Sequence, residues 1–188
     1  YYSNGTDSGR ISAAGTWYPW ALPTPDSPAV TAVAGTLFKG KYQVAVSYTN
    51  DVTGEEGGIS ASTNYELAAD GGLRITLPAA TAGATHVNVY VSTVSGSIPM
   101  LQTPVEIGMS TIDIPMLVNK REANQRYEAP LPAGTRIFEF NGRLCSVKGK
   151  DIFYSLPYRP GYYLPVEGRI TFPVDVSVAI GNQGGLYV

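Results

Sequence analysis

The chain has 188 residues, of which 15% are charged, and its net charge is −2. This sparse, nearly balanced charge argues against a basic face that binds nucleic acid, and no apolar run approaches the roughly 20 residues of a membrane span. The single cysteine, Cys145, rules out an internal disulfide, and the many Gly (21) and Pro (14) are typical of short strands joined by tight turns.

Residues 1–28 are predicted to contain a short strand, a turn at Asn4-Gly5 and a linker rich in Trp and Pro. The prolines between Pro19 and Pro28 fix φ and remove backbone donors, so this stretch is predicted to be extended without being a strand. The chain opens with Tyr1-Tyr2 instead of Met and stops in mid-pattern. We therefore expect a fragment of a longer polypeptide.

Residues 29–116 are predicted to form a β-sandwich organised around the strand at 41–50. Its alternation places Tyr42, Val44, Val46 and Tyr48 on one face. The strand at 85–92 alternates in the same way, and its polar residues, with Tyr90, are predicted to point outward. Runs at 64–67 and 73–77 flank a turn as a hairpin would. About seven strands in about ninety residues match the spacing of an immunoglobulin-like sandwich.

Residues 117–134 are predicted to be a linker, either irregular or with a short turn of helix. Residues 135–188 are predicted to form an antiparallel meander, because Asn141-Gly142 between two short runs is a strong hairpin signal. Another hairpin is predicted at Asn182-Gln183-Gly184. The alternating apolar residues between Ile170 and Ile180 are predicted to share one strand face. The predicted fold class is all-β, with a sandwich followed by meander hairpins.

Two sequence patterns resemble known domains. Tyr42-Gln43-Val44-Ala45-Val46 with Gly54-Glu55-Glu56 resembles a late strand and turn of a fibronectin type III domain, and Val87-Asn88-Val89-Tyr90-Val91 resembles its earlier central strand. Their order along this chain is reversed. The stretch 142–155, followed by Gly184-Gly185-Leu186-Tyr187-Val188, resembles a β-propeller blade that leads into the next one.

The whole arrangement resembles tail and neck structural proteins of tailed bacteriophages and prophages, in which a propeller carries an inserted immunoglobulin-like domain. This resemblance implies a non-enzymatic protein of the virion tail or neck. It also implies partners among other phage structural proteins, in a homo-oligomer or another symmetric assembly, without nucleic acid or membrane.

No residue pattern indicates catalysis, a metal site or a cofactor. His86 has neither a Cys nor a second His with which to share a metal, so we interpret it as a solvated strand residue. Cys145, inside a hairpin, is predicted to be buried and inert. Glu55 and Glu56 near Asp51 could form a calcium loop, but an acidic turn without EF-hand spacing is the favoured interpretation.

Aromatic clusters are the interaction candidates. Such side chains could be sugar-stacking platforms or anchors of a protein interface, because they bury a large area with few rotors. Packing between domains is the favoured interpretation for Trp17 and Trp20, whereas both interpretations stay open for the loop tyrosines. The candidates are Trp17, Tyr18, Trp20, Tyr158, Tyr162 and Tyr163.

Two other functions remain as alternatives to the tail protein. One is a carbohydrate-binding module of a secreted glycan-processing protein, in which the aromatic residues would contact glycan and the location would be extracellular. The other is a propeller enzyme whose paired carboxylates lie outside this sequence.

Overall fold

A computed structural model describes residues 1–11, 13–123, 127–182 and 185–188. Every regular element in these ranges is a β-strand, from β1 (Tyr2–Ser3) to β19 (Gly185–Tyr187), which confirms the predicted all-β class. Within the same ranges, the chain contains no helix that could span a membrane.

The strands fall into two compact units. The meander unit comprises residues 1–21 and 127–188, and the sandwich unit comprises residues 22–126. The sandwich unit is therefore inserted within the sequence of the meander unit. It extends beyond the predicted range of 29–116, because Leu22 packs into its core and residues 117–123 run beside its strand β10 (Pro99–Glu106).

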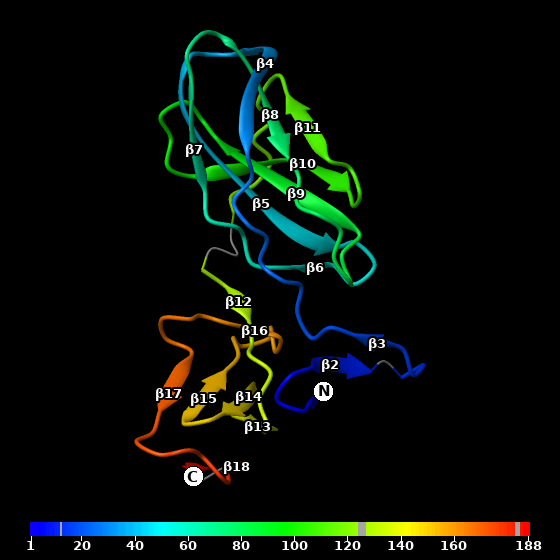
Figure 1. Ribbon diagram of the computed structural model, residues 1–188, viewed down its shortest axis with the longest axis vertical. Coiled ribbons are helices and arrows are strands. Elements are labelled where there is room, and N and C mark those ends of the chain that lie inside the picture. The colour runs from blue at the N-terminus through cyan, green and yellow to red at the C-terminus, as the bar shows by residue number, and fades with distance from the viewer. Residues whose placement is uncertain (12, 124–126, 183–184) are drawn as a thin grey trace. The chain divides into compact units, whose positions relative to one another are not determined.

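The sandwich unit consists of two antiparallel sheets, as predicted (Figure 1). Its other strands are β4 (Val30–Leu37), β5 (Gly40–Asn50), β6 (Glu55–Glu56), β7 (Thr63–Leu67), β8 (Gly71–Thr76), β9 (His86–Ser92) and β11 (Thr111–Ile114). The larger sheet has the order β10-β9-β5-β6, with β7 also paired to β5, and the smaller sheet has the order β11-β8-β4.

The strand order differs from one sequence-based expectation and from the standard immunoglobulin arrangement. The predicted hairpin of β7 and β8 is wrong, because these strands lie in different sheets. The first two strands of the unit, β4 and β5, also lie in different sheets, whereas those of an immunoglobulin constant domain share one sheet. The sandwich is therefore not of the standard immunoglobulin topology.

The core of the sandwich follows the predicted alternation. Tyr42, Val44, Val46 and Tyr48 of β5 all lie in the main apolar cluster, together with the valines of β9 and Leu73 and Ile75 of β8. Burying each such aliphatic side chain contributes about 1.5–3 kcal/mol. The central strands of the larger sheet are thereby fixed in register.

The second face of β9 differs from the prediction. Asn88, Tyr90 and Ser92 were expected to point into solvent, but all three are buried. Ile59 and Ala123 pack against Tyr90 in a separate small cluster. A covering segment that lies far away in the sequence hides this face, so the alternation of β9 alone could not indicate its burial.

The meander unit begins with a small sheet of β1, β2 (Ser8–Ile11) and β3 (Trp17–Tyr18). The predicted Asn4 turn is present, since Asn4 Oδ1 accepts hydrogen bonds from the backbone N–H groups of Thr6 and Asp7 at 2.9 and 2.7 Å. Trp17 and Tyr18 were predicted to be linker, but they pair with β2, because Pro interrupts the chain only from residue 19 onward.

The main sheet of this unit is an antiparallel meander, as predicted. It consists of β13 (Arg136–Phe140), β14 (Arg143–Lys148), β15 (Asp151–Tyr154) and β17 (Arg169–Thr171), in that order. Asn141 and Gly142 form the first turn, with φ values of 50° and 69°, as a two-residue hairpin turn requires. Outside it, β12 (Ala129–Pro130) pairs with β16 (Tyr162–Tyr163), and β18 (Ile180–Asn182) pairs with β19. The predicted turn at 182–184 lies partly outside the described residues.

Candidate functional site

Three of the six aromatic candidates pack inside the meander unit. Trp20 is 3% exposed, and its indole N–H donates to the carbonyl oxygen of Leu131 at 3.0 Å. Tyr162 is equally buried in the same apolar cluster. Tyr163 packs edge-on against Phe153 with ring centroids 5.6 Å apart. These three side chains therefore hold the segment before the sandwich unit against the strands that follow it in sequence.

Gly161 explains how Trp20 reaches this position. A Cβ atom at residue 161 would lie 1.8 Å from the carbonyl oxygen of Trp20. Only glycine allows the two backbones to approach so closely. Arg159 stacks over the Tyr162 ring at 4.4 Å from its centroid and pairs with Glu128 at 2.8 Å, so the same loop is also fixed by charge.

The other three candidates are more accessible. Tyr158 is 99% exposed and has a left-handed backbone with φ of 59°. Trp17 is 52% exposed, although its indole crosses the backbone at Gly9, where a Cβ atom would come within 2.3 Å of the ring nitrogen. Tyr18 is half-buried. The structure therefore groups Trp20 with Tyr162 in one cluster, while Trp17 and Tyr158 lie outside it.

The sequence did not indicate that part of the stretch 170–180 is exposed to solvent. Residues 170–180 were predicted to present one apolar strand face, but β17 ends at Thr171 and the chain then leaves the sheet. Phe172 and Val176 turn back to pack on the meander sheet. Four other side chains of this stretch are left exposed, and we call them the apolar row: Ile170, Val174, Val178 and Ile180.

A buried carboxylate with several partners lies in the sandwich unit. Glu56, on β6, has a side chain only 8% exposed. Its Oε1 accepts hydrogen bonds from Ser47 Oγ at 2.6 Å, from Asn88 Nδ2 at 3.0 Å and from the Tyr90 hydroxyl. Its Oε2 pairs with Arg121 Nη2 at 2.5 Å. The guanidinium of Arg121 also lies over the Tyr90 ring.

These contacts decide the charge state of the cluster. Burial alone would raise the pKa of Glu56, but hydrogen bonds from Ser47, Tyr90, Asn88 and Arg121 lower it below its ordinary value. Burial and the negative charge of Glu56 raise the pKa of the Tyr90 phenol. Glu56 is therefore an ionised carboxylate and Tyr90 a neutral donor, an arrangement that suits a structural anchor.

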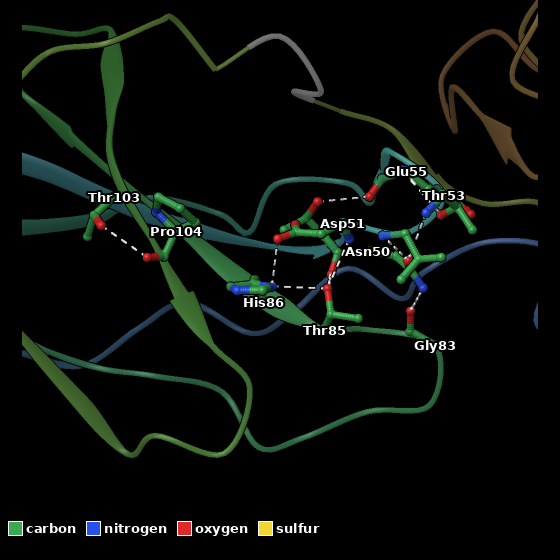
Figure 2. A network of polar contacts seen from close by, with 11 residues as sticks. Asn50, Asp51, Thr53, Glu55, Gly83, Thr85, His86, Thr103 and Pro104 are labelled. Atoms are coloured by element: carbon green, nitrogen blue, oxygen red, sulfur yellow. Dashed lines mark hydrogen bonds and ion pairs between the residues drawn. The ribbon is translucent and has the colours of Figure 1, made fainter.

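The acidic turn after β5 forms a separate polar network (Figure 2). His86 Nδ1 lies 3.1 Å from Asp51 Oδ2 and 3.0 Å from Thr85 Oγ1. Asn50 Oδ1 accepts hydrogen bonds from the backbone of Val52 and Thr53. His86 is thus half-buried and partnered, where the sequence predicted a solvated residue.

Neither of these networks has the composition of a metal site. Among the described residues, no group of three or more His, Cys, Asp or Glu side chains could hold a metal ion. In the acidic turn, Glu56 is turned inward to Arg121 and does not join Asp51 in a set of ligands. The hydrogen bonds of Asn50 and Thr85 instead hold the turn itself in shape.

Cys145 has the environment that the sequence predicted. It is buried on the meander sheet beside Val147 and Ile152. Burial raises the pKa of its thiol to about 11, and Arg143 offsets this only in part. A thiol that stays protonated at neutral pH is a poor nucleophile and a poor metal ligand.

No protein-family model and no curated protein matches the chain. Its function is therefore inferred from the surfaces and contacts described above.

Proposed function

We propose that the chain is a structural component of a bacteriophage-like tail or neck and acts through protein–protein interfaces. The observation that carries this proposal is the apolar row of the meander unit. Val174 is 71% exposed, and its three companions are more than two-fifths exposed. Exposed apolar side chains favour association, because each one that becomes buried contributes on the order of 1.5–3 kcal/mol.

Two further features support an interface. Tyr158 and Trp17 are exposed large aromatic residues, a type enriched in the energetic centres of interfaces. β17 lies at the edge of the meander sheet and pairs there with β15 on one side. The backbone groups of an edge strand can pair with a strand that another chain adds.

Immunogold electron microscopy of particles from the source culture tests the location. An antibody raised against this chain should label tails or necks. Bare particles, with the antigen found in the secreted fraction instead, would contradict the proposal. This experiment needs no knowledge of which surface makes the contact.

Sedimentation velocity over a concentration series tests the surface. We expect Val174→Asp combined with Val178→Asp to reduce self-association of the full chain at least tenfold, because two desolvated carboxylates oppose burial. Val52→Asp is the matched control, since Val52 is 88% exposed on a turn of the sandwich unit. An equal effect of the control would remove the apolar row from the interface.

The exposure of Trp17 supports one alternative, a glycan-binding module. Trp17 is exposed and Trp20 is buried, so a sugar that stacks on tryptophan should quench only the emission of Trp17. Oligosaccharide titrations of the parent chain and of Trp17→Phe distinguish quenching at Trp17 from quenching at Trp20. A flat titration of the parent chain would remove this alternative.

A further inference from the structure

The outer face of the larger sheet in the sandwich unit is open at the start of β5. The side chains that β5 turns to this face change in exposure along the strand. Ala45 and Ser47 are fully buried, whereas Gln43 is half-buried and Lys41 is exposed. β7 pairs with this open part of β5 (Figure 1). The two strands form the floor of a groove that we call the polar groove.

Four polar side chains form this floor. Lys41 lies directly opposite Glu66 in the β5–β7 pair, and Gln43 lies directly opposite Asn64. All four therefore project from the same face of the sheet, with Cβ atoms of opposed residues about 4.5–5.5 Å apart. Among the described residues, none of the four side chains forms a hydrogen bond or an ion pair. Their donors and acceptors are free to bind a ligand.

The turn between β9 and β10 forms the opposite wall of the polar groove. Ser95 donates its backbone N–H to the carbonyl oxygen of Lys41 at 2.7 Å, which fixes the turn beside β5. Its φ is 57°, a left-handed conformation that a residue other than glycine keeps only where its surroundings impose it. Together with Gly96 and the floor residues, it encloses about 510 Å³. Sites for small molecules have volumes of roughly 300–1,000 Å³.

The lining residues argue against several classes of ligand. The charges of Lys41 and Glu66 offset one another, so the polar groove favours neither an anion nor a cation. Tyr42 and Tyr65 also line it, but their side chains pack against the core of the sandwich. The groove therefore presents polar side chains, which do not suit a lipid or another apolar ligand.

We propose that the polar groove binds a neutral glycan. Each hydroxyl group of a sugar both donates and accepts a hydrogen bond, and the amides of Gln43 and Asn64 also do both. Lys41 adds donors and Glu66 adds acceptors at neighbouring positions, so adjacent hydroxyl groups of one sugar can be paired at the same time. This site goes beyond the proposed interface function and does not rest on it, since the apolar row belongs to the other unit.

An array of neutral and acidic oligosaccharides, probed with the fluorescently labelled full chain, tests the proposal. We expect binding to neutral oligosaccharides, and we expect Asn64→Ala and Glu66→Ala each to weaken it about tenfold, because each removes hydrogen bonds to the sugar. Both side chains are exposed, so the variants should fold. Glu106→Ala is the matched control, because it removes an exposed carboxylate from β10 of the same sheet. Equal weakening by the control would overturn the inference.

Salt separates a neutral ligand from a charged one. Raising the NaCl concentration from about 50 to about 500 mM should change the affinity less than about twofold, because screening acts on charges. A loss of about tenfold would show that the ligand is charged and would overturn the inference. Absence of binding to every neutral oligosaccharide on the array would also overturn it.

Two further outcomes would assign the site differently. Binding that is lost in Trp17→Phe and kept in Asn64→Ala would place the glycan at Trp17, which overturns the polar groove as its site. Binding that depends on Asn64 but occurs only on a peptide array would make the ligand a peptide and overturn the inference as well.

The proposed tail function is judged separately, by gold labelling of particles. Labelled tails without binding to neutral oligosaccharides would refute the glycan site alone. Bare particles with glycan binding that depends on Asn64 would refute the tail location alone.

Discussion

The sandwich unit and the meander unit differ in which side chains they bury and which they leave exposed. In the sandwich unit, both faces of the central strands are covered, and even the carboxylate of Glu56 has a partner at each oxygen. In the meander unit, the apolar row and Tyr158 are left exposed. The sandwich unit exposes apolar side chains too, such as Phe38 and Val52, so the difference lies in its buried polar cluster and in the succession of exposed apolar residues in the apolar row. A satisfied buried cluster stabilises its unit, whereas exposed apolar side chains favour contact with another chain.

Removal of Glu56 should have the largest effect. In Glu56→Ala, the buried donors Ser47, Asn88 and Tyr90 lose their acceptor, and we expect a loss of ~3 kcal/mol in the free energy of unfolding of the sandwich unit. Urea unfolding followed by circular dichroism measures it. Glu55→Ala, one position away on the more exposed side of β6, should change little. A small effect for both would mean that the sandwich does not depend on this cluster.

Within the meander unit, the buried Trp20 and the exposed Trp17 should differ in their contribution to stability. Trp20→Phe leaves the carbonyl of Leu131 without its donor, so we expect a loss of about 1–3 kcal/mol. Trp17→Phe alters an exposed ring and should change stability by less than about 0.5 kcal/mol. Denaturant midpoints from far-ultraviolet circular dichroism compare the two variants. The reverse order would show that the exposed tryptophan is the structural one.

The acid sensitivity of the sandwich unit should also depend on Glu56. Its folded pKa lies below the ordinary value of 4.5, so its stabilising effect is complete above that pH and is lost as the pH falls through the folded pKa. The free energy of unfolding should therefore fall more steeply below pH 4.5 in the parent chain than in Glu56→Gln. Parallel curves for the two proteins would contradict an ionised Glu56.

The smallest effect is expected at an exposed ion pair. Arg74 and Asp113 also form a close pair, with Nε and Oδ1 2.7 Å apart, and the hydrogen bond from Arg74 lowers the pKa of Asp113. Both side chains are nearly half exposed, so water and salt screen their attraction. Asp113→Asn should leave the denaturant midpoint unchanged within error. A clear shift would mean that exposure does not separate this pair from that of Glu56.

Much of the fold could be predicted because it depends on local patterns. The alternation of β5 and β9 identified their inner faces, and Asn141-Gly142 identified its hairpin, since turn geometry is set by the residues of the turn itself. The sequence identified the aromatic candidates, but it could not indicate which of them are buried and which are exposed. Trp17 and Trp20 lie three residues apart, and only the distant Gly161 and Leu131 decide which one is buried.

The sequence by itself determined the all-β class, the inward residues of the central strands and the burial of Cys145. The tertiary structure alone decided that β7 and β8 lie in different sheets, that the outer face of β9 is covered, and that Glu56 meets Arg121, 65 positions away. The reason is physical. Periodicity and turn chemistry act between neighbours in the chain, whereas burial and charge pairing depend on segments that only folding brings together.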